Sequence, residues 1–129
     1  MGFTASALRG HTPRGGIVDH RLARRMLISQ VRLGRIPLNE VCDAHPELIR
    51  AAANVGTETA ADCPICEATK LRIVTYVFGH RLPAYGRCVS TAADLRQVAK
   101  LTAGGEAMAY VVEACTSCRW HHLLRVLPV

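Results

Sequence analysis

The C-terminal half of the chain alternates short apolar segments with turn residues, a pattern typical of a β-sheet. Residues 71–78 have the β-branched and aromatic composition of a strand. One helix interrupts this pattern at residues 92–103, between a Thr91 cap and the glycines that follow it. The predicted strands are residues 71–78, 85–89, 108–114 and 120–127.

The N-terminal half has helical periodicity instead. Residues 19–33 predict an amphipathic helix that Asp19 caps and Gly34 ends. We expect the apolar residues of this helix to form its inner side and the arginines to lie largely away from it. The expected inner residues are Leu22, Met26 and Leu33, with Ile28 and Val31 beside them.

Two shorter helices are predicted after this one. Residues 37–44 favour a short second helix, and Pro46 suits the first turn of a third helix that runs to Val55. The glycine- and proline-rich residues 1–17 indicate a flexible basic arm. Residues 56–62 are polar and acidic, and we expect them to be a linker.

Two cysteine pairs of identical spacing carry the clearest chemistry. Cys63 and Cys66 form one C-x-x-C turn, and Cys115 and Cys118 form the second. Two such turns that face each other supply four thiolates at tetrahedral geometry, which favours one structural Zn²⁺ with no open position for water. Local disulfides, free thiols and a rubredoxin-like iron centre are the alternatives for the same residues.

The two turns are unusual in two respects. The 48 residues between them exceed the loop of roughly 15–20 residues in compact two-turn sites, so the ribbon carries an insertion. Neither turn has glycine after its second cysteine, where a positive φ is often needed, because Glu67 and Arg119 occupy these positions.

The remaining cysteines and the paired histidines receive simpler predictions. Cys42 and Cys88 are expected to be buried apolar thiols. His121 and His122 alternate faces if they lie in a strand, so at most one of them approaches the metal. An ordinary surface position is the simpler interpretation of both histidines.

These elements together predict an α+β fold, with an N-terminal short helical bundle followed by a four-cysteine zinc β-ribbon that carries an inserted helix. The expected division is a flexible basic arm at residues 1–17, a helical region at 18–62 and a zinc-ribbon domain at 63–129. At 129 residues, half of them apolar but only 5% aromatic, the core is thin and a metal would stabilise it.

The composition indicates a cytoplasmic protein. No apolar run approaches the roughly 18 residues that a membrane span requires, and residues 1–8 lack the features of a secretory signal. Thiols stay reduced in the cytoplasm, so paired cysteines there favour metal over disulfides.

The net charge of +6 is distributed in blocks, with +6 on residues 1–36, −4 on residues 37–62 and +4 on residues 63–129. Such blocks indicate binding to nucleic acid or to an acidic protein surface, although a solvated arginine-rich helix gives the same pattern. The candidate binding residues are Arg14, Arg21, Arg24, Arg25, Arg32, Arg35, Arg119 and Arg125.

Two resemblances extend this interpretation. Residues 109–120, which include the second C-x-x-C turn and Trp120, are similar to the zinc ribbons of transcription elongation factor S and RNA polymerase subunits. The acidic dipeptide through which elongation factor S stimulates RNA cleavage has no counterpart here. The whole chain resembles a family of small actinobacterial proteins of unassigned function, on residues 41–52, 63–66, 74–79 and 115–123.

No Ser/His/Asp set, phosphate-binding loop, paired carboxylates or dinucleotide fingerprint is present. We therefore expect a non-enzyme without a small-molecule substrate. The leading hypothesis is a zinc-ribbon accessory factor that docks on a nucleoprotein machine, RNA polymerase before the ribosome. The alternatives are a protein-interaction adaptor that makes no nucleic-acid contact, and a zinc- or redox-responsive regulator.

Overall fold

The computed structural model describes residues 3–9 and 18–129. The helices are α1 (Arg21–Arg32), α2 (Pro46–Val55) and α3 (Ala92–Leu101), with short 3₁₀ turns at Ala5–Ala7 and Leu38–Glu40. The strands are β1 (Val18–Asp19), β2 (Thr57–Asp62), β3 (Lys70–Gly79), β4 (Arg87–Val89), β5 (Ala107–Ala114) and β6 (His121–Pro128).

All six strands form one antiparallel sheet in the order β1-β6-β5-β3-β2, with β4 paired to β3. Its centre is the long β3–β5 pairing, which runs from Arg72 opposite Ala114 to Gly79 opposite Ala107. The mixture of helices and antiparallel strands confirms the α+β class.

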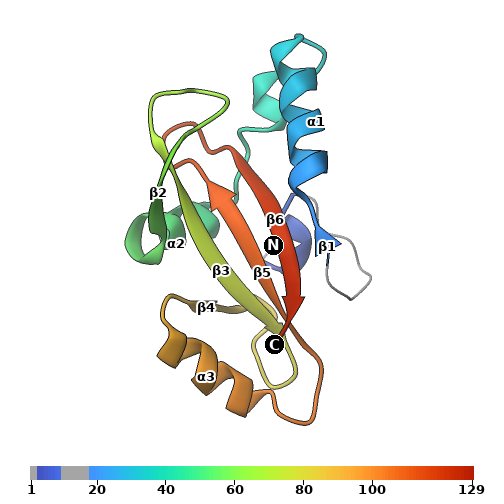
Figure 1. Cartoon of the computed structure of the whole chain (residues 1–129), viewed down its shortest axis with the longest axis vertical. Coiled ribbons are helices and arrows are strands. Elements are labelled where there is room, and N and C mark those ends of the chain that lie inside the picture. The colour runs from blue at the N-terminus through green and yellow to red at the C-terminus, as the bar shows by residue number, and fades with distance from the viewer. Residues whose placement is uncertain (1–2, 10–17) are drawn as a thin grey trace.

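Side-chain alternation along β3 gives the sheet two different faces. Val74 and Tyr76 pack on one face with Leu48 of α2, and the segment of residues 3–9 joins this core. Leu71 and Val77 lie on the other face, where α1 covers one end and α3 the opposite end (Figure 1). The two N-terminal helices therefore contact different strands, and a helical bundle is not confirmed.

The main predicted elements are confirmed within a few residues, and α3 is the helix inserted between strands. Two of the predicted elements are wrong. Residues 57–62 form β2, not a linker. The second helix is only the 3₁₀ turn Leu38–Glu40. At the start of α1, His20 occupies the cap position, while Asp19 Oδ1 accepts a hydrogen bond from the Arg21 N–H at 2.9 Å.

The prediction of a flexible arm is also wrong for those of its residues that the structure describes. Phe3 and Leu8 are 4% and 1% exposed and belong to the main core. Leu123 N–H also donates to the Arg9 carbonyl at 2.8 Å. The remaining arm positions, residues 1–2 and 10–17, lie outside the described residues, and Arg14 is among them.

The inner side of α1 differs from the prediction. Leu22, Met26 and Leu33 are 63%, 61% and 64% exposed. Ile28 is buried instead, with Leu27 and Val31 packed beside it. The helix has apolar residues on two sides. The side that carries Ile28 and Arg24 faces the protein.

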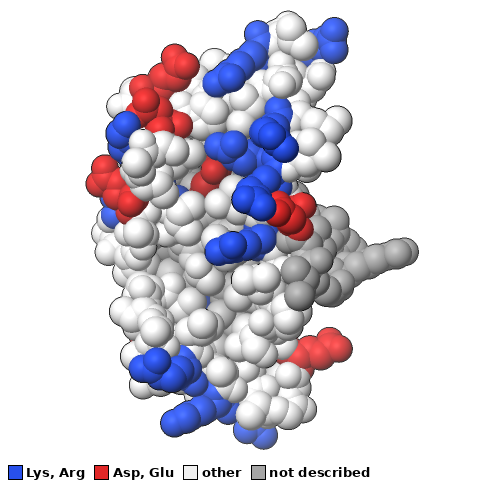
Figure 2. Space-filling view, in the orientation of Figure 1, with Lys and Arg blue, Asp and Glu red and all other residues white. Residues whose placement is uncertain are grey.

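Figure 2 shows basic side chains gathered over α1 and a second basic group at the end of the molecule where α3 lies. Among the helices of the described part, none has the length and apolar character required to cross a membrane.

Candidate metal centre

The two C-x-x-C turns meet at one end of the sheet. The first turn connects β2 to β3, and the second connects β5 to β6. Arg72, near the start of β3, pairs with Ala114, at the end of β5. This register brings the two turns together, although 48 residues separate them in the sequence.

The two turns have similar backbone hydrogen bonds, although the bond that closes the first turn spans one residue more. Cys63 N–H donates to the Thr69 carbonyl at 2.9 Å, and Cys115 N–H donates to the Trp120 carbonyl at 2.9 Å. Glu67 N–H and Arg119 N–H donate to the carbonyls of Cys63 and Cys115, each at 3.0 Å. The two turns are therefore similar in shape around their cysteines.

The residue after the second cysteine has a positive φ in both turns, 57° at Glu67 and 71° at Arg119. The positive φ that is often needed at this position is therefore present, although neither turn has glycine there. Residues with a Cβ are strained in this region, so both turns keep a shape that their own sequences disfavour.

The four sulfur atoms form a compact group. Cys63 Sγ lies 3.7 Å from Cys118 Sγ, and Cys66 Sγ lies 3.6 Å from Cys115 Sγ. All four sulfurs lie within 4.8 Å of one another. A tetrahedral ion with metal–sulfur bonds of about 2.3 Å requires sulfur separations of about 3.8 Å. The group thus has the size of a metal site, and its pairs are too far apart for disulfides.

The surroundings of the four sulfur atoms favour a bound cation. Ile65 N–H and Cys118 N–H point at the sulfurs of Cys63 and Cys115, each at 3.4 Å. Cys63 and Cys115 are fully buried. Burial raises the pKa of Cys63 to about 11, because a thiolate is costly in an apolar site unless a cation neutralises it. The four cysteines can hold a metal ion.

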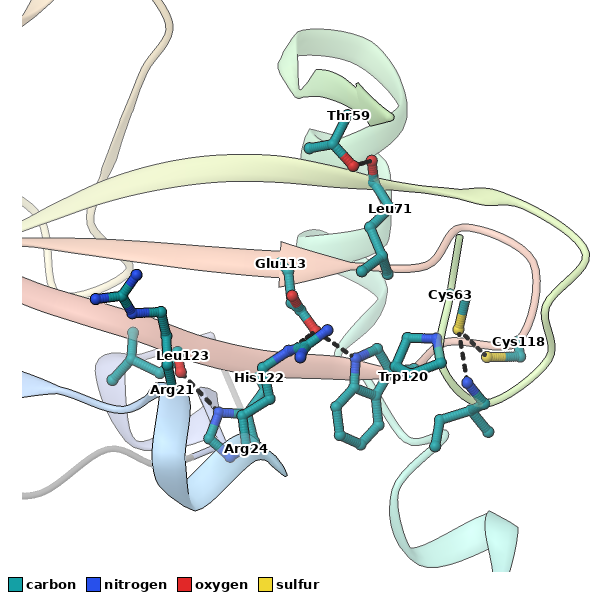
Figure 3. Close-up of polar contacts among 12 residues, drawn as sticks. Arg21, Arg24, Thr59, Cys63, Leu71, Glu113, Cys118, Trp120, His122 and Leu123 are labelled. Atoms are coloured by element: carbon teal, nitrogen blue, oxygen red, sulfur yellow. Dashed lines mark hydrogen bonds and ion pairs between the residues drawn. The ribbon is translucent and has the colours of Figure 1, made fainter. Parts of the chain in front are cut away.

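Trp120 links this group to the rest of the protein. It is fully buried among Ile28, Val41 and Leu71. Its indole Nε1–H donates to Glu113 Oε2 at 2.8 Å, and Arg24 Nε donates to the same oxygen at 2.6 Å (Figure 3). The two donors compensate a buried carboxylate and attach α1 to the end of the sheet that carries the cysteines.

Cys42 is a fifth thiol at this end of the molecule, a position that its sequence context did not reveal. It is half-buried and packs against the cluster that contains the four paired cysteines. Burial raises its pKa, and a hydrogen bond with Cys118 opposes the effect. Cys88, also half-buried, lies in β4.

The histidines are not at the surface, so that interpretation is wrong. His121 and His122 are each 3% exposed. His121 Nε2 lies 3.1 Å from Asp43 Oδ1, and His122 Nδ1 lies 2.6 Å from the Leu123 carbonyl oxygen. Neither residue belongs to the four-cysteine group.

The predicted basic residues separate into two classes. Arg21 pairs with Asp19, Arg24 with Glu113, and Arg119 donates to the Ala44 carbonyl. Arg32 makes one long hydrogen bond to the Pro64 carbonyl at 3.3 Å. Of the predicted arginines in the part of the chain that the structure describes, three are exposed and have neither an ion pair nor a side-chain hydrogen bond to a described residue: Arg25, Arg35 and Arg125.

One protein family matches nearly the whole chain. The profile of a family of unknown function (DUF5318) matches residues 11–127. Uncharacterised proteins of Mycobacterium tuberculosis (Rv0049) and Mycobacterium bovis (Mb0050) are each 41% identical to the chain over 108 residues, which cover 84% of this chain and 77% of theirs. No solved structure matches the chain.

Proposed function

The chain belongs to the DUF5318 family, and we propose that it is a non-enzymatic docking module closed by one structural Zn²⁺. Its partner in this proposal is a nucleoprotein machine, RNA polymerase before the ribosome. The observation that carries the proposal is an exposed apolar stripe on α1 with arginines along one side of it. We call this surface the α1 docking face and define it as Leu22, Met26 and Leu33 with Arg21, Arg25 and Arg32.

Zinc is the proposed ion because the donor set is four thiolates at tetrahedral spacing. Four protein ligands leave no position for water or substrate, so the ion would stabilise the fold. Its role would be to hold the end of the sheet to which α1 is attached.

The α1 docking face has the chemistry of an interface. Its three apolar side chains are each more than 60% exposed, and apolar groups gathered on one face commonly mark a binding surface. Leu22, Met26 and Leu33 follow helical spacing, so they form one stripe along the helix. The Arg24–Glu113 ion pair fixes the helix to the sheet, so the stripe is presented on a rigid support.

The charge of the α1 docking face indicates which kind of partner it fits. Arg25 and Arg32 lie along one side of the stripe, and Arg125 lies on β6, which α1 contacts. Because Arg21 and Arg24 are partly neutralised by their own carboxylates, the face is less basic than the sequence indicates. A surface that offers both apolar side chains and acidic or phosphate groups fits it best. The protein subunits of a nucleoprotein machine provide that combination.

The test is capture of RNA polymerase or ribosomal subunits by the tagged protein from a lysate of its own host cells, with and without nuclease. Recovery of either set should fall when Leu22→Ser and Met26→Ser are combined, and also with Arg25→Glu plus Arg32→Glu. Leu95→Ser plus Arg96→Glu on α3 is the matched control, since both residues are exposed there.

The nuclease arm separates the hypotheses. Phosphate contact predicts loss of binding after nuclease and a steep decrease in affinity with salt. An adaptor that touches only protein should resist both treatments. If subunits of both machines are missing, or if the α3 control is as weak as the α1 variants, the proposed docking function is wrong.

Cys42 favours a second candidate, a redox-responsive regulator, because it supplies a spare thiol beside Cys118. A peroxide would oxidise these two thiols to one disulfide and be reduced to water, and Zn²⁺ would leave with the loss of a ligand. Mild peroxide should then release zinc from the wild type faster than from Cys42→Ser. Equal retention in both proteins excludes this candidate.

A further inference from the structure

A cavity of about 600 Å³ lies between α2 and the connection from β3 to β4. It opens on the face of the sheet opposite to α1, because Tyr76 at its floor and Leu71 beneath α1 alternate along β3. Apolar and aromatic groups dominate its walls. The main lining residues are Phe3, Ala51, Val55, Tyr76, Tyr85 and Cys88.

The Tyr76 hydroxyl is the polar group at the floor. Tyr76 is 5% exposed, and no hydrogen bond of its hydroxyl is found within residues 3–9 and 18–129. The hydroxyl is also absent from the sealed, unpartnered polar atoms of these residues, so solvent reaches it. Water can satisfy this hydroxyl in the free protein, and a bound molecule with an acceptor oxygen can replace that water.

The position of this hydroxyl follows from its neighbours. Tyr76 on β3 pairs with Cys88 on β4, so the two side chains share a face. Burial raises the pKa of Tyr76, and the charges of Cys88 and Glu47 add to the effect. Both neighbours line the cavity, and the hydroxyl therefore faces into it.

The charges at the opening cancel. Glu47 and Arg50 are the charged residues that line the cavity, and they form an ion pair with each other. Neither charge is left over for a ligand. Aromatic rings are available instead, since Phe3 and Tyr76 lie 5.0 Å apart at the floor and Tyr85 is 63% exposed at the wall. Rings of this kind favour flat, apolar molecules.

From these observations we infer that the cavity is a binding site for a small, neutral, ring-containing molecule with an acceptor oxygen that takes a hydrogen bond from the Tyr76 hydroxyl. The volume suits such a ligand, since sites for small molecules commonly measure about 300–1,000 Å³. This site is separate from the α1 docking face. It adds a ligand where the sequence predicted no small-molecule substrate.

The probe for the test is prodan, a neutral naphthyl ketone whose emission shifts to the blue in an apolar site. The wild type should bind it saturably. Ala51→Trp fills the cavity and should weaken binding about tenfold or more. Tyr76→Phe keeps the ring and should weaken binding about three- to tenfold, the usual range for one lost hydrogen bond.

The matched control is Ala53→Trp, because Ala53 lies on the same helix and is exposed outside the cavity. This variant should bind prodan like the wild type. Circular dichroism of every variant checks folding. Amide chemical shifts in the ¹⁵N-labelled wild type should change around Ala51 and Cys88 on titration.

Three results would overturn the inference. The first is non-saturable binding to the wild type, and the second is equal affinity of the Ala51→Trp and Ala53→Trp variants. The third is a shift pattern centred on α1. Unchanged affinity in Tyr76→Phe would overturn the role given to the hydroxyl. None of these results bears on capture of a macromolecule by α1, so the two proposals fail independently.

Discussion

Arg24 of α1 and Glu113 of β5 form a largely buried ion pair, with Arg24 Nε 2.6 Å from Glu113 Oε2. The Glu113 side chain is 5% exposed, and the Arg24 side chain 21%. The Trp120 indole donates to the same carboxylate oxygen at 2.8 Å. One acidic group therefore holds together a helix, a strand and the tryptophan next to the four-cysteine group.

We predict that Arg24→Met destabilises the protein by about 3 kcal/mol, because it leaves the buried carboxylate of Glu113 with only one donor. Urea unfolding followed by circular dichroism measures the change. Arg25→Met is the control, since Arg25 is exposed beside it and should change stability by less than about 0.5 kcal/mol. Equal effects of the two substitutions would show that the ion pair does not matter.

The second prediction concerns the metal. The reduced, purified protein should contain one equivalent of zinc by elemental analysis, and Cys66→Ser should lose most of it. Cys88→Ser should keep the full equivalent, because Cys88 lies outside the four-cysteine group. Absence of stoichiometric metal from the wild type would contradict the proposed zinc centre.

A chelator tests the same centre through stability. Zinc binding to four thiolates contributes on the order of 10 kcal/mol in small zinc domains. A strong chelator should therefore unfold the cysteine-bearing end of the sheet, and added zinc should restore it. Unfolding midpoints measured with and without chelator give the result, and identical midpoints would mean that no structural metal is bound.

The cysteine group was predictable because its chemistry is local. Each turn is four residues long, and the spacing alone identifies the four cysteines that the structure brings together. The strands β3, β5 and β6 were also predictable, since their apolar and β-branched residues stand out from the flanking turns. Strand β2 was not. Its residues are polar or small and mostly exposed, because it lies at the sheet edge, and only its pairing with β3 makes it a strand.

The orientation of α1 is a second feature that the sequence could not predict. Its sequence has apolar residues on two sides, and local periodicity favoured Leu22 and Met26. The side that faces the protein is chosen by Glu113, which is 89 residues away from Arg24 in the chain. Phe3 gave no signal either, because a single aromatic residue among small residues has no period. Such choices depend on tertiary contacts.

The third prediction concerns the first C-x-x-C turn. Glu67 has a φ of 57°, and a residue with a Cβ is strained there by about 1–2 kcal/mol, against about 0.5–1 kcal/mol for the extra flexibility of glycine. Glu67→Gly should therefore stabilise the protein by about 0.5 kcal/mol, measured by urea unfolding at equal zinc content. Ala68→Gly is the control, since Ala68 does not have a positive φ, and it should destabilise. A loss of stability in Glu67→Gly would show that the backbone at Glu67 is not strained.

The last prediction is a pH dependence that comes from His121. Burial, then the nearby Arg9 charge, lowers the pKa of this histidine to about 4, although Asp43 opposes the shift. Its unfolded pKa is 6.5. Between these values the unfolded chain binds a proton that the folded protein does not, so stability falls as the pH falls through this window. From pH 6.5 to pH 5 the loss should be about 1.5 kcal/mol.

Urea unfolding of the wild type and His121→Gln at these two pH values measures the effect. Both proteins should be compared at equal zinc content, so that protonation of the thiols affects them alike. Burial also lowers the pKa of His122, but this residue is present in both proteins and cancels. The wild type should lose more stability than the variant on acidification. Parallel losses would mean that His121 remains proton-accessible in the folded state, and its burial against Asp43 would then be wrong.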